Sequence, residues 1–580
     1  MIFVLDAYCK KIPDSLKDNK WCYLGSPDSI KNAARAFKTE NRVFLGRYIE
    51  SITDSCRDNY VDYIGTLSEL QENKLLWYSS RFASKSISQT SMFQQYVYLK
   101  LAGYLASVHD NIVFITDNNE LLDNIRLLPV HGQYKIYKNS CSHFLVNFLK
   151  RIKCSISSYK YFFLLLYSKI FKKKHDLADY DVIIYSWIED AVFTKLPEFN
   201  DIFFVNLESF LKAKGLKTGR MAAPVVSIPH LNKLNKYFDN VIDSLGYVSF
   251  FDLTRISLTV FKAVKPVNNS NNLLDFELLN FLLDNEIKRE NDQHIFKKFI
   301  LCYHAFKNVE RTLKKQAVLI SIYENQPFEK MLYIAFAGHR RIGYLHTIIP
   351  NNWLDYRKSK YENNMPLPEI ILTTGRVWSD FLAAQYGKSS AIDIAGSLRY
   401  EHIWDSSDRS NNSKNIIVAL PIYWDIAESI QNEILNILDN HRSLLSNYKV
   451  SIKPHPYLPS FAIYNDRFKN HQNCVYIDTP IPELLKDCAL LITSGSTAAY
   501  EAVLTRVKTL YYRPEIFSDG TDHFIKDHLF IAHENDFKDV LVRSLNEKTI
   551  PAASKEKYFS VPDYEKFYSY VKDTGLNRND

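Results

Sequence analysis

The chain has 580 residues, of which 46% are hydrophobic and 24% charged; this is ordinary for a globular protein and long enough for two large domains or three smaller ones. A net charge of +7 is mild and does not indicate nucleic acid as a partner. Eight cysteines lie scattered without a C-x-x-C pair, which argues against a zinc site or a disulfide framework and suits a reducing cytoplasm. We expect no signal peptide and no segment long enough to cross a bilayer.

Short apolar runs alternate with helical patterns in the first 140 residues. We expect strands at 2–6, 21–25, 42–45, 75–79 and 112–116, and helices at 51–72 and 91–108. Alternation of this kind predicts a parallel sheet covered by helices.

A basic and aromatic helical stretch follows at 141–175. Between Lys150 and Lys174, basic residues interleave with the run Tyr161 to Tyr167. Such a segment could lie on an anionic membrane surface, or it could be a core helix with a solvated basic face, and the sequence leaves both interpretations open.

A second α/β run begins with a strand at 181–187 that ends at Glu189 and Asp190, and a mostly helical insert follows at about 231–315. A β-rich run at 318–323 places Glu324 at its carboxyl end. Asn325 is the expected N-cap of a helix at 328–337. The next strand, 342–345, ends at His346. One βαβ unit thus predicts a carboxylate and an imidazole on the same sheet edge.

We predict a domain boundary in the polar segment 401–414, which has no apolar periodicity and lies between two α/β patterns. Residues 1–400 would form the N-terminal α/β domain and residues 415–560 the C-terminal one. We expect a tail helix at 561–580.

Two loops in the C-terminal half have the residue types that bind phosphate. The strand that starts near Tyr448 leads into Lys453, Pro454, His455 and Pro456, and the strand at 489–493 leads into Ser494, Gly495, Ser496 and Thr497 before a helix that contains Glu501. Hydroxyls and amides at a helix start favour a phosphate, and Lys453 and His455 would add donors or positive charge. Because both loops follow predicted parallel strands, we expect a nucleotide site there, with Glu501 bound to the ribose.

These motifs resemble the donor domain of GT-B glycosyltransferases. The Lys-Pro-His-Pro run and the Ser-x-Ser-Thr loop with its Glu helix are most similar to bacterial sialyl-, polysialyl- and Kdo transferases, which use CMP-activated sugars. Segments 323–329, 343–347 and 396–400 resemble bacterial surface-carbohydrate biosynthesis proteins. The resemblance implies an α/β, GT-B-like fold: two Rossmann-like domains face a cleft, and the N-terminal one carries the helical insert. It also implies that the tail helix crosses back onto the N-terminal domain.

The resemblance also implies a function. It suggests a cytoplasmic transferase, peripheral on the inner membrane, that moves a nonulosonic acid or Kdo-like sugar from CMP to a capsule, O-antigen or lipooligosaccharide glycan, free or lipid-linked. The donor would be a substrate, so no cofactor is expected. No Asp-x-Asp spacing falls at a strand end, so we expect protein donors in place of a metal.

Five residues are candidates for the reaction itself: Glu324, His346, Asp190, Glu189 and His455, the last by stabilising the leaving phosphate. Glu324 is the first choice for base or nucleophile, because it would end a strand that faces the cleft. Asp190 and Glu189 come next, since Glu189-Asp190-Ala191 loosely matches an acidic sialyltransferase motif from which Ala191 departs. His346 could orient the acceptor or a donor carboxylate, and Arg399 could bind an anionic group. Each acid could instead cap a helix, and His346 could be a core residue.

Other functions remain open from sequence alone. A UDP-sugar transferase would use the same loops. A hydrolysing UDP-sugar 2-epimerase has the same two-domain fold and a similar Ser-Gly/Glu helix, although such enzymes are usually shorter. A non-catalytic polysaccharide assembly protein would be expected to have lost Lys453, His455, Ser494, Ser496 or Glu501.

Overall fold

The computed structural model describes most of the chain: residues 2–9, 12–25, 37–125, 128, 134–137, 164–170, 176–223, 227–259, 261, 273–314, 316–404, 413–458, 468–547, 551 and 553–573. Most of the basic stretch at 141–175 and most of the expected linker at 401–414 lie outside these residues. No helix among the described residues is long and apolar enough to cross a membrane.

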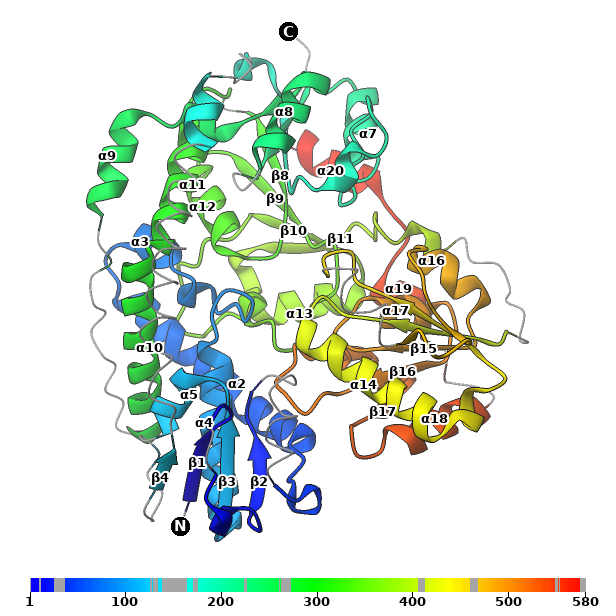
Figure 1. Ribbon diagram of the computed structural model, residues 1–580. Helices are drawn as coiled ribbons and strands as arrows, with labels where there is room; N and C mark the ends of the chain where they lie inside the picture. The colour runs from blue at the N-terminus through cyan, green and yellow to red at the C-terminus, as the bar shows by residue number, and fades with distance from the viewer. Residues whose placement is uncertain are drawn as a thin grey trace.

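Three separate parallel sheets organise the molecule (Figure 1). The first has the order β2-β3-β1-β4, the second β11-β10-β9-β8-β5-β6-β7 and the third β14-β13-β12-β15-β16-β17. The two larger sheets are the Rossmann-like domains that the βα alternation and the resemblance predict, so the expected GT-B-like α/β fold is confirmed. Strands β11 and β12 flank the expected boundary and lie in different sheets.

The first sheet comprises β1 (Ile2–Asp6), β2 (Lys20–Tyr23), β3 (Ile112–Thr116) and β4 (Tyr134–Tyr137). Helices α2 (Gly46–Leu70) and α4 (Met92–Val108) pack together beside it. Two predictions here are wrong. Residues 75–79 belong to helix α3 (Lys74–Tyr78), because Asn73 caps it by accepting from the amide of Leu76 at 3.0 Å. Residues 42–45 form only one bridge, between Arg42 and Trp21.

The seven-stranded sheet is the scaffold of the N-terminal domain. Its strands are β5 (Val182–Ser186), β6 (Thr218–Ala222), β7 (Val241–Ile242), β8 (Val318–Ile322), β9 (Arg340–Tyr344), β10 (Ile370–Thr373) and β11 (Ala391–Ile394). Helices α12 (Pro327–Ala335) and α13 (Arg376–Tyr386) connect β8 to β9 and β10 to β11. The central strands β5 and β8 are buried along their whole length, as continuous Val/Ile/Leu runs in a parallel sheet require.

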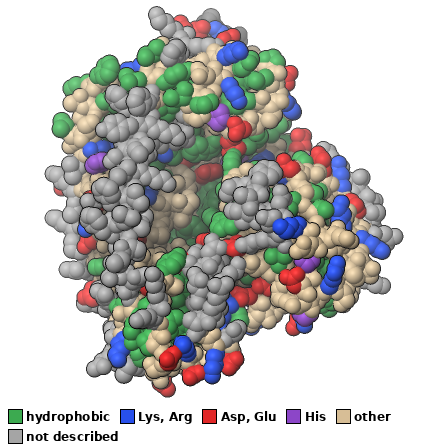
Figure 2. Space-filling model, viewed as in Figure 1, with side chains coloured by type: hydrophobic (Ala, Val, Ile, Leu, Met, Phe, Trp, Pro, Cys, Tyr) green, Lys and Arg blue, Asp and Glu red, His purple; other side chains and the backbone are tan. Residues whose placement is uncertain are grey.

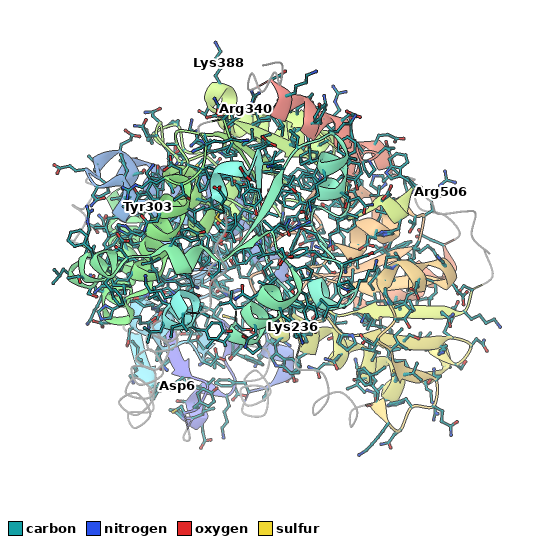
Figure 3. The ribbon with its side chains drawn as sticks, turned by 90° about the horizontal axis from the view of Figure 1, so that it is seen from above. Asp6, Lys236, Tyr303, Arg340, Lys388 and Arg506 are labelled. Carbon is teal, nitrogen blue, oxygen red and sulfur yellow. The ribbon has the colours of Figure 1, made fainter. Side chains whose placement is uncertain are left out.

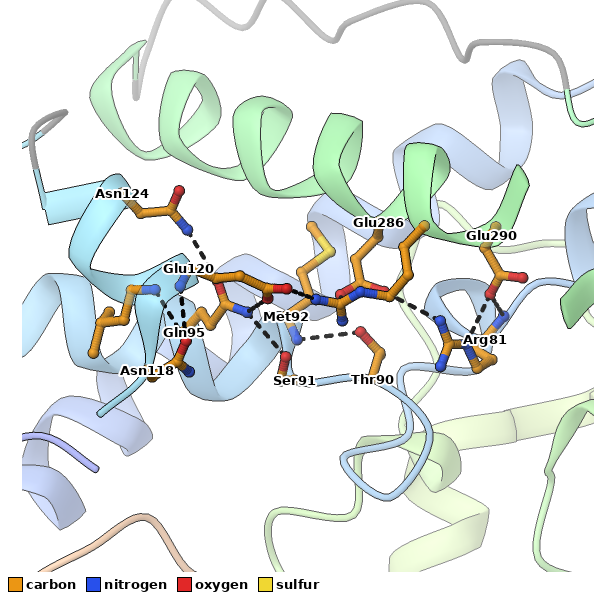
Figure 4. A network of polar contacts seen from close by, with 12 residues as sticks. Arg81, Thr90, Ser91, Met92, Gln95, Asn118, Glu120, Asn124, Glu286 and Glu290 are labelled. Atoms are coloured by element: carbon orange, nitrogen blue, oxygen red, sulfur yellow. Dashed lines mark hydrogen bonds and ion pairs between the residues drawn. The ribbon is translucent and has the colours of Figure 1, made fainter. Parts of the chain in front are cut away.

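The region of the expected helical insert contains α8 (Ile228–Tyr237), α9 (Phe250–Leu258), α10 (Leu273–Gln293) and α11 (Ile295–Glu310), besides the short β7. Helix α10 is held to the first sheet's helices by ion pairs (Figure 4). Arg81 donates to Glu290 at 3.0 Å, and Glu286 pairs with Arg289 at 2.8 Å, which in turn contacts Glu120. The insert therefore connects the first sheet to the seven-stranded one.

The C-terminal sheet comprises β12 (Asn415–Ala419), β13 (Lys449–Lys453), β14 (Cys474–Tyr476), β15 (Leu490–Thr493), β16 (Thr509–Tyr512) and β17 (Phe530–Ala532). Helices α14 (Trp424–Asn440), α17 (Ala498–Leu504) and α18 (Phe537–Asn546) flank it. Seen from above, this domain lies to one side of the others, on the side marked by Arg506 (Figure 3).

The C-terminal segment crosses back onto the N-terminal domain, as the resemblance implies. The amide of Ser397 donates to Ser560 at 2.9 Å, and the ring of Phe559 stacks on Tyr400 at 4.4 Å. Helix α20 (Tyr564–Lys572) then packs against α7 (Leu207–Ala213). The last described segment of the chain thus packs against the N-terminal domain, although it follows the C-terminal domain in sequence.

Candidate active site

The carboxyl edges of the two larger sheets face each other. In the loop after β9, the amide of Asn352 donates to Asp519 at 2.9 Å and its side chain donates to Ser518 at 2.9 Å. Residues 518–520 belong to the loop after β16, so loops at the ends of parallel strands meet from both sides. Figure 2 shows the molecule hollowed between these parts. Open α/β sheets bind ligands at such edges.

Glu324 and His346 come together at the edge of the seven-stranded sheet. His346 Nε2 lies 3.0 Å from Glu324 Oε1, and the Phe203 ring packs edge-on against the imidazole at 4.7 Å. The His346 side chain is 5% exposed and the Glu324 side chain 23% exposed, so the carboxylate is the part of the pair that solvent reaches. A carboxylate held by an imidazole can accept a proton from a hydroxyl or attack an electrophilic carbon.

The helix start beside Glu324 differs from the prediction. The N-cap of α12 is Gln326 and not Asn325, because Gln326 forms a capping box with Glu329: its amide donates to the Glu329 carboxylate at 2.8 Å. Asn325 instead adopts a left-handed conformation with φ of +55° and donates to the backbone of Asp355 at 2.5 Å. Capping by Glu329 leaves Glu324 outside the helix-start hydrogen bonds.

Buried ionisable groups lie behind Glu324, and the sequence analysis did not single them out. Burial, with Glu324 nearby, raises the pKa of Glu329 well above its ordinary range. Burial raises the pKa of Asp355 to about 7, and burial together with Lys85 lowers the pKa of Lys330 to about 8. A neutral Glu329 therefore adds no negative charge beside Glu324.

The first phosphate-type loop follows β13. The ammonium of Lys453 donates to the carboxylate and the backbone oxygen of Asp478 at 2.5 and 3.2 Å, so it is turned towards Asp478. His455 accepts from the amide of Tyr457 at 3.2 Å, and Pro456 between them is exposed. Burial, with Arg399 and Lys453 nearby, lowers the pKa of His455 to about 4. The imidazole is therefore neutral near pH 7 and offers hydrogen bonds rather than charge.

The second loop lies between β15 and α17. Ser494 is fully buried, and Gly495 has φ of +52° and donates its amide to the Tyr511 hydroxyl at 2.8 Å. Ser496 accepts from the amide of Ala498 at 3.3 Å. Thr497 holds the N-cap position, and its side chain makes no capping hydrogen bond. This loop would therefore contact a phosphate through hydroxyl groups and not through a positively charged side chain.

Arg399 lies between the C-terminal domain, near Glu501 and His455, and Glu189 of the N-terminal domain, which form the two walls of the site. Arg399 is exposed, and its guanidinium lies 5.7 Å from the centre of the Tyr400 ring. The phenol of Tyr400, then Glu501 and Glu189, raise the pKa of Arg399 and so stabilise its charge. Arg399 thus presents a positive charge beside His455, where an anion could bind.

Two further contacts cross the cleft. Glu501 is nearly buried and its carboxylate lies 2.9 Å from His402 Nε2, so a ribose would have to share or displace that contact. Burial and a hydrogen bond to Glu189 raise the pKa of Tyr457, which places Glu189 against the first phosphate-type loop. Asp190 is exposed and lies 2.9 Å from His230 Nε2.

Sequence reasoning missed Tyr457, His402 and Asp519 at this site. Tyr457 directly follows the His-Pro pair, and His402 lies three residues after Arg399. Their closeness in sequence to predicted site residues could have identified both. Asp519 had no such signal, because only the fold brings it near Gly495. A methyl group on Gly495 would lie 3.7 Å from the Asp519 carboxylate, whose pKa burial raises to about 6. In the described residues, no group of three or more metal-ligand side chains lies together.

Searches of family models and of curated proteins found no match. A search of solved structures found many matches. UDP-GlcNAc 2-epimerase from Methanocaldococcus jannaschii matches over 68% of this chain and 99% of its own, with 10% identity and a TM-score of 0.39. MurG from Acinetobacter baumannii matches over 68% and 99%, with 8% identity and a TM-score of 0.32. The pneumococcal O-GlcNAc transferase GtfA, in complex with UDP and GlcNAc, matches over 47% and 60%, with 11% identity and a TM-score of 0.29.

Proposed function

We propose that the protein is a glycosyltransferase that moves a sugar from a nucleotide donor to a bacterial surface glycan or its lipid-linked precursor. The observation that carries the proposal is the position of Arg399, beside His455 of the C-terminal loop and near Glu189 of the opposite wall. A donor phosphate beside Arg399 would lie between two domains, where an acceptor can enter from the other side.

The proposed chemistry divides between the two walls. Arg399, neutral His455 and the Thr497 hydroxyl would stabilise the charge that develops on the leaving phosphate. Glu324, positioned by His346, would take the proton from the acceptor hydroxyl or attack the anomeric carbon. Glu189 and Asp190 are the second choice for this role. No step of this proposal needs a metal or another cofactor.

The proposal admits two donors. A CMP-linked nonulosonic acid or Kdo-like sugar has one phosphate, which suits a site where Lys453 is already paired with Asp478 and Arg399 supplies the charge. A UDP-linked sugar is the second candidate. UDP-GlcNAc is named as the substrate of the archaeal epimerase, and the pneumococcal transferase structure contains UDP and GlcNAc.

Calorimetry with CMP, CDP, UDP and GDP tests the proposal. We expect one of them to bind at micromolar affinity and the Arg399→Ala variant to lose roughly 10-fold or more of that affinity, since a charge-assisted hydrogen bond is removed. Arg376→Ala, an exposed arginine in α13 of the same domain, is the control and should bind normally. UDP binding without CMP binding would show that the donor is a UDP-sugar. Release of a free sugar epimer without transfer would show that the protein is a UDP-sugar 2-epimerase. Failure of all four nucleotides to bind would contradict the proposal.

A further inference from the structure

The most exposed large hydrophobic side chains of the described residues gather in one place. They are Phe251 (77%), Leu258 (78%) and Phe250 (67%) on α9, and Ile170 (72%) on the adjacent helical residues 164–170. Other exposed hydrophobic side chains, such as Leu70 and Val108, lie at the ends of separate helices. Single exposed apolar residues are ordinary, but a group of this kind marks an interaction surface.

Helix α9 presents this group on one face. Phe251 and Leu258 are seven residues apart and therefore project from the same side of the helix, whereas Ile256 is buried on the other side, where α9 packs against α11. In Figure 1, α9 projects from the outer edge of the molecule, and Figure 2 shows hydrophobic side chains on that part of the surface. This face lies at the edge of the molecule, away from the cleft.

Positive charges accompany the apolar side chains. The Lys169 ammonium lies 5.2 Å from the ring centre of Phe250, and Arg255 is exposed on α9 itself. The carboxylate on this helix, Asp252, is turned inward, where it accepts from Ser249 at 2.8 Å and from Asn308 at 2.9 Å. The sequence that follows Ile170 continues with Lys172, Lys173 and Lys174.

We propose that the surface formed by Ile170, Phe250, Phe251 and Leu258, with Lys169 and Arg255, docks onto an anionic lipid bilayer. Phenylalanine and leucine side chains flanked by lysine and arginine have the composition that binds at the boundary between headgroups and acyl chains. Protein interfaces are depleted in lysine, so a face of apolar side chains accompanied by lysine and arginine fits an anionic bilayer better than a protein partner. The proposal goes beyond the transferase reaction, because lipid binding requires neither a donor nor turnover.

Co-sedimentation with vesicles of phosphatidylethanolamine and phosphatidylglycerol tests this surface. We expect the wild-type protein to bind these vesicles and to bind phosphatidylcholine vesicles much less. The triple variant Phe250→Ser, Phe251→Ser, Leu258→Ser should partition at least about 10-fold less, because three apolar side chains no longer insert. Lys169→Glu with Arg255→Glu should weaken binding and reduce its dependence on salt.

Two controls keep the result specific. Leu70→Ser with Val108→Ser removes exposed apolar side chains elsewhere and should sediment like the wild type. The triple variant should keep its melting temperature and its nucleotide affinity, since its side chains are exposed and lie outside the cleft. Wild-type binding by the triple variant would overturn the proposal. So would a wild-type protein that ignores anionic vesicles but forms a dimer that the triple variant cannot form.

Discussion

The position of Glu324 can be predicted from the sequence, but the buried residues that surround it cannot. Strand order alone predicts that Glu324 and His346 share an edge, and the structure places them 3.0 Å apart. The capping carboxylate of Glu329 could be suspected only from its position three residues after Gln326. The buried residues Asp355 and Lys85 come from distant parts of the sequence, so no local sequence pattern predicts that they lie near Glu324.

Replacement of Glu324 by Gln tests its proposed role. The change is nearly isosteric, so folding and nucleotide affinity should be retained, whereas turnover should fall by about 100-fold or more because the amide can neither accept the proton nor attack carbon. Steady-state kinetics and calorimetry measure the two effects separately. Glu369→Gln, a partly exposed acid just before β10, is the matched control. Full activity in the Glu324 variant would transfer the role to Glu189 or Asp190.

The state of His455 can be measured directly. We expect its imidazole to titrate near pH 4 in the free protein, because burial and the neighbouring Arg399 and Lys453 disfavour the charged form. A bound phosphate should raise that pKa, since a negative charge favours the imidazolium. NMR titration of His455, assigned by the His455→Gln variant, with and without nucleotide tests both statements. A free-protein pKa near 6.5 would show that the loop is more solvated than this structure indicates.

At the scale of elements, several strands of the two larger sheets follow from the sequence. Apolar runs such as Val318–Ile322 and Leu490–Thr493 are buried in parallel sheets, and the periodicity is unambiguous there. The short strand Val241–Ile242 was missed because it has only two residues. The short apolar run at 75–79 predicts a strand, but the Asn73 cap and packing against α11 and α12 select a helix.

The crossing of the C-terminal segment depends on a glycine. Gly396 has φ of +75°, and a methyl group there would lie 1.9 Å from the backbone oxygen of Val561. Gly396→Ala should therefore lower the free energy of unfolding by about 3 kcal/mol, from backbone strain and from the clash. Gly387 has φ of +54° with open space around it, so Gly387→Ala should cost only about 1 kcal/mol. Urea unfolding measures both, and equal losses would show that the crossing does not constrain Gly396.

At the scale of the whole molecule, the first sheet bridges the other two domains. Arg42 forms a two-pronged ion pair with Glu534, and Glu515 accepts from the amides of Leu45 and Gly46. A cavity of about 80 Å³ lies at this junction, and Glu433 lines it. The sequence predicts each domain but not this junction, because its charges pair across hundreds of residues.

Glu433 makes the junction sensitive to pH. Burial and Glu534 raise its pKa to about 8, above the ordinary value of 4.5. The folded protein therefore holds the Glu433 proton more tightly than the unfolded chain does. The free energy of unfolding is then highest below about pH 4.5, and this stability is lost as the pH rises through 8. Glu433→Gln should thus stabilise the protein at pH 8, by about 2 kcal/mol, and have little effect at pH 5. Thermal unfolding at both values measures this, and equal effects would contradict it.

Hydrogen exchange with and without the nucleotide that binds tests the central claim most directly. We predict protection at 453–458 and 494–501 from donor binding, and at 324–328 and 346–352 across the cleft. The Arg399→Ala variant should lose this protection at the same nucleotide concentration. Protection confined to other surfaces, or none at saturating nucleotide, would contradict a nucleotide-sugar site between these two sheets.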